Sequence, residues 1–493
     1  MLRRIRRVLA ALMFIGITLL FLDFTGSLQA YIGWMAKVQF LPAIMALNIA
    51  VIIGLLAVTL IFGRVYCSVI CPLGIMQDLI AWIGGRRWKG KRWHEMKPGR
   101  YSHSEEKRWL RISVLVIMVI SIIFGLSIIT SLLAPYSSYG RIASTLLQPV
   151  YIFLNNWLAG ISESMGNYWF YEKDLWLRSV PTLIVASLTL LIIAVLAWKG
   201  GRTYCNTICP VGTVLGYVSK WSWIGINLDK NKCIGCKRCE KSCKTSCIDI
   251  DKGTVDHSRC VSCGVCIGKC KSDALSYSHL RHKPKDRDTD MGRRSFLIET
   301  ALVTSSVLLA QEKKKVDGGL AKIEDKVMPK RTTKVTPPGS LSADNLSKHC
   351  TACQLCVSEC PNGVLRPSSS LSDFMQPYSS FERGYCRPEC TRCSEVCPTG
   401  AIIRITREEK SSIQTGHAVW IEANCIPITD GVSCGNCARH CPTGAIQMID
   451  YKGVRVPAVN ESLCIGCGAC ENLCPSRPLS AIYVEGHEHH SLI

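Results

Sequence analysis

The sequence predicts a fold of two kinds: a membrane α-helical domain of four spans made from a duplicated two-helix unit, and small cysteine-rich α+β domains. Three observations in the 493-residue chain predict it. Four long apolar runs occupy the N-terminal half, a cysteine-containing segment occurs twice beside them, and six clusters of closely spaced cysteines follow. These clusters contain 24 of the 29 cysteines, so they are the main chemical feature of the chain.

The four apolar runs lie at about residues 8–24, 40–62, 110–133 and 180–198. An α-helix needs about 20 apolar residues to cross a bilayer, and the runs are close to this length or exceed it. The first run could instead be a cleaved signal peptide, but no small-residue cleavage site clearly follows it. We therefore expect a four-span membrane domain over residues 1–224.

Basic residues predict how this domain is oriented. Four arginines precede the first run and ten basic residues separate the second run from the third, whereas the other two connections contain few. Because cytoplasmic loops are enriched in Lys and Arg, both ends of the four-span unit should be cytoplasmic, as in a multi-pass protein of the bacterial inner membrane. The net charge of +21 thus reflects membrane topology, and we expect no nucleic-acid partner.

A twelve-residue segment occurs twice, as Gly63–Gly74 and as Gly201–Gly212, with eight identical positions. Each copy follows an even-numbered run and carries a C-x3-C-P motif, which indicates that a two-helix unit was duplicated. The four motif cysteines are Cys67, Cys71, Cys205 and Cys209. A spacing of four places both sulfurs of a pair on one side of a helix. They could hold a thiolate-preferring metal or a cluster, form redox-active disulfides, or simply pack.

Six further motifs have the spacing of iron–sulfur ligands. Three cysteines two residues apart can surround one 4Fe-4S cubane, while the fourth binds a neighbouring cluster. The predicted ligands, motif by motif, are Cys233, Cys236, Cys239 and Cys243; Cys260, Cys263, Cys266 and Cys270; Cys350, Cys353, Cys356 and Cys360; Cys386, Cys390, Cys393 and Cys397; Cys425, Cys434, Cys437 and Cys441; Cys464, Cys467, Cys470 and Cys474. We expect six 4Fe-4S clusters, two in residues 225–280 and four in residues 341–493, each region forming an α+β ferredoxin-like domain.

Zinc and disulfides explain these motifs less well. Structural zinc prefers two separated C-x2-C pairs, and a disulfide framework is typical of small secreted proteins. No haem is expected, because all eleven histidines lie outside the apolar runs and no C-x-x-C-H motif is present.

The fourth cysteines predict how the motifs pair. In residues 225–280, Cys270 should complete the first site and Cys243 the second. Among the later four motifs we expect nested pairing, the third with the sixth and the fourth with the fifth. The remaining cysteine, Cys247, is expected to be a small buried hydrophobic residue.

The junction between the two halves resembles an export signal. Arg293 and Arg294 precede Ser-Phe-Leu and an apolar run that ends near residue 310, short for a span but typical of a signal. Residues 291–310 could therefore be an internal twin-arginine signal, an uncleaved fifth membrane anchor, or an apolar helix with a basic flank. Residues 311–340 are expected to form a linker, and segments 401–405 and 445–449 to be strands of the last domain.

The connection between the third and fourth runs is rich in aromatic side chains. They could stack on a quinone headgroup, or they could form the aromatic belt common at membrane interfaces. The aromatic residues are Tyr136, Tyr139, Tyr151, Phe153, Trp157, Tyr168, Trp169, Phe170, Tyr171 and Trp176.

Two family resemblances cover nearly the whole chain. Residues 1–280, with both C-x3-C-P motifs and two cubane motifs, resemble NapH/MauN ferredoxin-type membrane proteins. Residues 291–485, with Arg293-Arg294 and four cubane motifs, resemble NapG/MauM ferredoxin-type proteins. The resemblance implies a fusion that takes electrons from the quinone pool, by oxidising (mena)quinol, to a periplasmic reductase or cytochrome. It implies a quinol dehydrogenase-type subunit without its own terminal catalytic site.

Two other roles remain open at this point. Residues 1–280 are also similar to CcoG-type proteins, which serve metal-centre assembly, so the chain could be a maturation factor for a redox metalloenzyme. Alternatively, the last domain could stay in the cytoplasm as a polyferredoxin fed by soluble donors.

Overall fold

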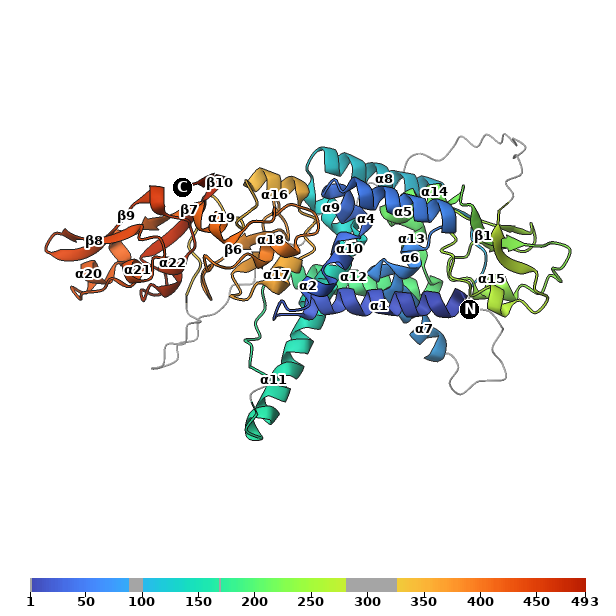
Figure 1. Cartoon of the computed structure of the whole chain (residues 1–493), viewed down its shortest axis with the longest axis horizontal. Coiled ribbons are helices and arrows are strands. Elements are labelled where there is room, and N and C mark those ends of the chain that lie inside the picture. The colour runs from blue at the N-terminus through green and yellow to red at the C-terminus, as the bar shows by residue number, and fades with distance from the viewer. Residues whose placement is uncertain (1, 88–100, 168–169, 281–325) are drawn as a thin grey trace.

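The computed structural model describes residues 2–87, 101–167, 170–280 and 326–493. The proposed export signal and the first part of the linker lie outside these residues. Figure 1 shows a helical domain with one cysteine-rich unit at each of its two ends. The inner unit, residues 224–280, lies at the end where α1 (Leu2–Leu22) begins, and the outer unit, residues 326–493, lies at the end where α1 finishes.

Two helices of the described residues are long and apolar enough to cross a membrane, and they lie in α1 and in α12 (Val180–Gly200). The two other apolar runs are not single helices. The second divides into α4 (Phe40–Met45) and α5 (Ile49–Phe62), and the third into α8 (Arg108–Ile123) and α9 (Ser127–Leu133). The expectation of one continuous helix per run is therefore wrong for these two.

Local backbone chemistry explains both breaks. Leu47 adopts a positive φ of 51° after α4, and the side chain of Asn48 then caps α5 by accepting a hydrogen bond from the Val51 amide. At the second break Gly125 has a φ of +68°, a conformation that glycine adopts without strain and that ends α8.

Shorter helices complete the helical domain. They are α2 (Gln29–Ile32), α3 (Trp34–Lys37), α6 (Tyr66–Val69), α7 (Pro72–Arg87), α10 (Pro135–Ile142), the π-helical turn η1 (Ala143–Leu147), α11 (Gln148–Ser164), α13 (Thr203–Thr207) and α14 (Pro210–Ser219). α10 is buried throughout. α11 instead projects away from the other helices, and Phe153 and Trp157 on it are exposed.

The inner unit is a small α+β fold. Strand β1 (Ile224–Leu228) pairs antiparallel with β4 (Leu275–His279), and β2 (Ile248–Asp249) pairs with β3 (Thr254–Val255). In the chain, α15 (Arg238–Ser242) lies between β1 and β2, and η2 (Ile267–Lys269) lies between β3 and β4. Each ends just before the fourth cysteine of a motif.

The outer unit repeats this plan with two-stranded antiparallel sheets joined by short helices. Its strands pair as β5 (Leu365–Pro367) with β6 (Pro377–Ser379), β7 (Ile413–Trp420) with β10 (Ile482–Leu492), and β8 (Ile446–Tyr451) with β9 (Val454–Val459). Its helices are α16 (Ala343–His349), α17 (Leu355–Glu359), α18 (Arg392–Val396), α19 (Arg407–Ser412), α20 (Ile426–Thr429), α21 (Asn436–Arg439) and α22 (Ala469–Leu473), with η4 (Glu422–Asn424) and η5 (Glu461–Leu463).

Of the two strands expected from sequence, 445–449 largely coincides with β8, but 401–405 is not a strand. The backbone amides of that segment have other partners: Ile402 donates to the Cys397 sulfur, and Ile403 donates to the Gly339 carbonyl.

One hydrophobic core runs from the helical domain into the outer unit. It contains Phe21 and Tyr139 from the helices together with Cys353, Val357 and Val396 from the third and fourth motifs. The remaining outer motifs and the inner unit have cores of their own. The outer unit is thus packed onto the helical domain, with its third and fourth motifs nearest.

Candidate iron–sulfur sites and the cysteine quartet

In the inner unit the cysteines group as the spacing predicts. One cavity is lined by Cys260, Cys263 and Cys266 together with Cys243 from the first motif. In the other group, the Cys239 thiol lies close enough to Cys233, and to Cys270 of the second motif, for their charges to interact. The exchange of fourth cysteines between these two motifs therefore agrees with the structure.

In the outer unit neighbouring motifs pair, and the expected nested pairing is wrong. Cys397 lies within electrostatic reach of all three close cysteines of the third motif. Cys360 in turn lies near Cys386 and Cys393 of the fourth. The same exchange joins the last two motifs. Cys474 lines one cavity with Cys425, Cys434 and Cys437, and Cys441 lies near Cys464 and Cys467.

These groups suit clusters of several irons. Each combines three cysteines of one loop with the fourth of its neighbour, as dicluster ferredoxins require. Backbone amides donate to ligand sulfurs, from Ala352 to Cys350 and from Ala481 to Cys474, and such donors favour the thiolate form. Within the described ranges, no three Cys, His, Asp or Glu side chains are close enough to hold a single metal ion.

The two outer pairs of sites adjoin at one point. The backbone amide of Cys386 donates to the carbonyl of Cys467 across 2.9 Å. This bond joins the site of Cys386, Cys390, Cys393 and Cys360 to the site of Cys464, Cys467, Cys470 and Cys441. The outer sites therefore follow one another in space, from the third motif beside the helical domain to the fifth motif farthest from it.

A buried lysine lies at this point. Lys410 is 5% exposed, and its ammonium group donates to the Cys386 sulfur across 3.2 Å. Burial favours its neutral form, but the neighbouring Cys386 thiolate holds the pKa of Lys410 above its usual value. Sequence reasoning missed this residue because it lies 24 positions from Cys386 and belongs to no motif.

Cys247 is more than a packing residue. It is 2% exposed, its sulfur lies 3.5 Å from the Cys243 sulfur, and it lines the same cavity as the second set of ligands. The Thr245 hydroxyl donates to Cys247 across 3.2 Å. The Thr245 hydroxyl and the Cys247 thiol therefore lie beside the predicted ligand Cys243.

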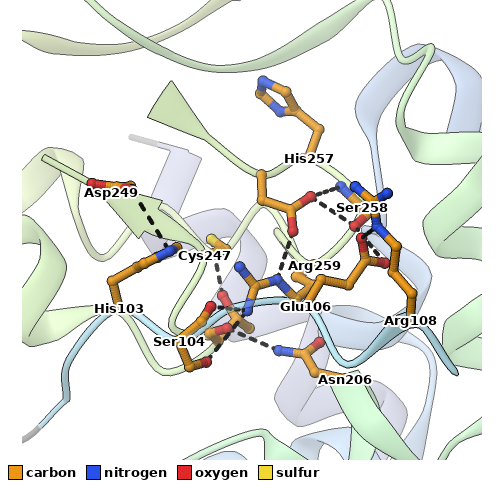
Figure 2. A network of polar contacts seen from close by, with 12 residues as sticks. His103, Ser104, Glu106, Arg108, Asn206, Cys247, Asp249, His257, Ser258 and Arg259 are labelled. Atoms are coloured by element: carbon orange, nitrogen blue, oxygen red, sulfur yellow. Dashed lines mark hydrogen bonds and ion pairs between the residues drawn. The ribbon is translucent and has the colours of Figure 1, made fainter. Parts of the chain in front are cut away.

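Polar contacts fix the inner unit to the helical domain (Figure 2). Arg259 donates to the Ser104 carbonyl at 2.6 Å and also pairs with Asp256. His103 faces Asp249 at 3.7 Å, and the Asn206 amide donates to the Thr245 carbonyl at 3.0 Å. His103 and Ser104, in the segment that precedes α8, and Asn206, which follows Cys205, thus hold the segments around the second site in place.

The four C-x3-C-P cysteines meet at one place in the helical domain. All four are buried, at 4–5% exposed, and each lies within electrostatic reach of the other three. We call Cys67, Cys71, Cys205 and Cys209 the cysteine quartet. The expectation that both cysteines of a pair lie on one helix is wrong: Cys67 and Cys205 lie in the short helices α6 and α13, whereas Cys71 and Cys209 directly precede α7 and α14. Only the fold brings the four together.

A cleft of about 740 Å³ opens where the helical domain meets the outer unit. Phe24, Tyr171, Lys173 and Trp176 line one wall, and the opposite wall includes Pro361, Arg383, Tyr385, Arg387 and Arg392. Pro361 and Arg387 directly follow the cysteines Cys360 and Cys386, so the cleft borders the site that these two complete. The aromatic residues of the connection are accordingly divided between several places. Tyr136 and Tyr139 are in the core, Tyr151, Phe153 and Trp157 lie on α11, and Tyr171 and Trp176 line the cleft. Phe170 is exposed, and Tyr168 and Trp169 lie outside the described residues.

Comparison with known proteins agrees with this chemistry. A family described as a 4Fe-4S binding domain matches residues 44–91 and 182–230, and two families described as 4Fe-4S dicluster domains match residues 256–364 and 432–477. The chain is 28% identical over 161 residues to the ferredoxin-type protein NapF of Escherichia coli (strain K12), covering 32% of this chain and 90% of NapF.

This is a ferredoxin-type iron–sulfur protein with an electron-transfer role. Two further relatives of this iron–sulfur protein carry related descriptions. The methylamine utilization ferredoxin-type protein MauM of Paracoccus denitrificans (strain Pd 1222) is 30% identical over 148 residues, covering 28% of this chain and 66% of MauM. The putative electron transport protein YccM of Escherichia coli (strain K12) is 26% identical over 212 residues, covering 43% of this chain and half of YccM.

Proposed function

We propose that this ferredoxin-type protein is a membrane-bound relay that oxidises (mena)quinol and delivers electrons to a periplasmic reductase or cytochrome. One observation carries the proposal. The two sets of iron–sulfur sites lie at opposite ends of the helical domain, and the outer set shares that domain's core. Such an arrangement is expected of a protein that connects the two sides of a membrane and not of a soluble ferredoxin.

Exposed apolar side chains support the membrane location. On α12, Leu188 and Leu191 are 52% and 60% exposed, and Ile123 at the end of α8 is 73% exposed. Apolar surface of this extent marks a surface that another apolar phase covers. We propose four crossings, of which those in the second and third runs are interrupted, with the inner unit in the cytoplasm and the outer unit in the periplasm. Residues 291–310 would provide export or a fifth crossing.

The cleft is the place we propose for the quinol headgroup. Its volume of about 740 Å³ is within the range of small-molecule sites. Trp176 forms part of the cleft wall, and the guanidinium groups of Arg366 and Arg383 lie 4.6 and 5.0 Å from the centre of its ring, which fixes its position. Lys173 and Arg387 can donate hydrogen bonds to the quinol oxygens and favour the loss of their protons.

The neighbouring sites match the electron count of the reaction. Oxidising one quinol to quinone releases two electrons and two protons. When bound, a cubane accepts or releases one electron, so the paired sites of the third and fourth motifs suit a two-electron donor. The protons leave through the open side of the cleft.

Anaerobic electron paramagnetic resonance tests quinol oxidation. A reduced menaquinone analogue added to the membrane-embedded protein should produce the signals of reduced cubanes. Signals that appear only with dithionite would reject quinol as the donor while leaving the relay in place.

Two variants test the cleft. Trp176→Ala and Arg387→Ala should slow reduction by the quinol analogue at least tenfold and leave reduction by dithionite unchanged. Trp157→Ala is the matched control, because this tryptophan is 60% exposed on α11 and outside the cleft. Equal rates in all three variants would remove the quinol site from the cleft.

A reporter fused after Ile493 tests the topology. A protease added to intact spheroplasts should remove this reporter, as expected for a C-terminus in the periplasm. The opposite result would place the outer unit in the cytoplasm and reject the transmembrane relay.

A further inference from the structure

We infer that the cysteine quartet, Cys67, Cys71, Cys205 and Cys209, holds a seventh iron–sulfur cluster shared between the two halves of the duplicated helical domain. This cluster would connect the inner and outer sites. The inference goes beyond the proposed function and does not depend on quinol as the donor.

The quartet has the arrangement of a cluster site. Every pair among its four thiols is within electrostatic reach, and the same is true of Cys350, Cys353, Cys356 and Cys397 in the third site. The two segments that match a 4Fe-4S binding domain contain only two cysteines each. Because a cluster of either common type takes four cysteine ligands, neither half can hold one alone.

Hydrogen-bond donors surround the quartet as they surround ligand thiolates. The Gln77 amide donates to the Cys205 sulfur at 3.3 Å, and the backbone amide of Gly212 donates to the Cys209 sulfur at 3.3 Å. A guanidinium nitrogen of Arg64 lies 3.8 Å from the Cys67 sulfur. Three of the four sulfurs thus have a donor that would stabilise a thiolate.

The two repeats also cross-link each other at this site. Arg64 of the first copy donates to the Cys205 carbonyl, and Arg202 of the second donates to the Cys67 carbonyl at 2.7 Å. Gly74 and Gly212 lie against the same two carbonyls so closely that a side chain at either would clash with them. Residues identical in both copies therefore hold the four thiols in one fixed arrangement.

Buried positive charge points to an anionic occupant. Arg64 is fully buried, and its hydrogen-bond partners in the described structure are carbonyls, an amide oxygen and a thiol, none of them a carboxylate. Burying an uncompensated cation is costly. On the side nearest the inner unit, the single carboxylate of Asp78 pairs with three cations, Arg202, Lys244 and Arg6. A cluster with four thiolates is anionic and would compensate this excess of positive charge.

The quartet also lies between the two sets of cluster sites. Towards the inner unit, the Arg202 amide donates to the carbonyl of Lys244, which follows the ligand Cys243. Towards the outer unit, the Tyr204 hydroxyl donates to the Leu133 carbonyl, just before α10. Gly140 on α10 lies against the carbonyl of the ligand Cys353. A centre at the quartet would therefore adjoin both the second site and the third.

Metal content tests the inference on the full chain, purified anaerobically in detergent. Six cubanes require about 24 irons per chain, whereas a seventh cluster raises the iron and acid-labile sulfide to about 26 or 28, depending on its type. A count of about 24, or zinc in place of the extra iron, would overturn the inference.

Variants locate the extra iron. The double variant Cys71→Ser with Cys209→Ser should lose two to four irons and one Mössbauer component, and retain the six cubane signals. Ser131→Ala, at a fully buried position of the helical domain outside the quartet, is the control and should retain all iron. Gln77→Leu keeps every cysteine and should shift the midpoint potential of one signal only. Unchanged iron in the double variant, or unchanged potentials in Gln77→Leu, would refute the assignment.

Discussion

The ammonium group of Lys410 donates a hydrogen bond to the sulfur of Cys386 across 3.2 Å, from a residue that is only 5% exposed. The same group donates to the carbonyls of Arg387 and Cys390, so three acceptors fix its position. A cation held against a ligand thiolate favours the reduced cluster, which is more negative than the oxidised one. Lys410 is therefore expected to set the potential of the site where the two outer pairs adjoin.

Replacing Lys410 with methionine should lower one midpoint potential. A hydrogen bond to a charged group contributes roughly 1.5–3 kcal/mol, which corresponds to a decrease of about 65–130 mV for a one-electron couple. Redox titration followed by electron paramagnetic resonance measures it. Lys452→Met is the control, because Lys452 is exposed and pairs with Glu422 instead of a ligand. A potential unchanged in Lys410→Met would show that the bond does not affect the cluster.

The pairing of neighbouring outer motifs predicts which variants lose the same cluster. Cys397→Ala should remove the signal that Cys353→Ala removes, and Cys474→Ala the signal that Cys437→Ala removes. Each loss should be about four irons per chain, because a cubane that lacks a ligand is unstable. Comparing the spectra of the four variants checks this. If Cys474→Ala removed the same signal as Cys353→Ala, nested pairing would be correct after all.

Cys247 is predicted to modulate a cluster without binding it. Its thiol can donate a weak hydrogen bond to the Cys243 thiolate 3.5 Å away. Cys247→Ala should therefore retain all iron and shift one potential of the inner unit downwards, while Cys243→Ala should lose a cluster. Iron analysis and redox titration of the two variants distinguish the roles. Loss of iron from Cys247→Ala would identify Cys247 as a ligand.

His490 is predicted to make the outer unit sensitive to acid. Burial, and secondly the neighbouring His487, lower the pKa of His490 to about 4. Its Nε2 contacts the Thr336 hydroxyl at 2.8 Å, and its Nδ1 has no partner in the described structure. Because the unfolded chain binds this proton below about pH 6.5 and the folded protein only near pH 4, stability is complete above pH 6.5 and declines as the pH falls.

The difference can be measured by thermal unfolding. At pH 5 the folded protein should be about 2 kcal/mol less stable than at pH 7.5 from this residue alone. His490→Gln should remove that part of the pH dependence, whereas His489→Gln, at an exposed position, should retain it. A pH dependence equal in both variants would contradict the prediction.

The sequence by itself determined the chemistry of this protein. Ligand spacing is a local property, so four copies of C-x2-C-x2-C-x3-C and two variants of it predicted 24 ligands without knowledge of the fold. The apolar runs predicted α1 and α12 for the same reason, since length and composition suffice. The duplication was visible because Arg64 and Arg202, like the cysteines beside them, occupy equivalent positions.

Only the tertiary structure decided which distant residues meet. Whether Cys360 completes the site of the neighbouring motif or that of a distant one depends on which segments pack together in the folded chain. The contact of Lys410 with Cys386, the cleft, and the convergence of Cys67 with Cys205 have the same origin. Each joins segments that no short spacing relates, and burial together with backbone hydrogen bonds across the domain decides where they lie.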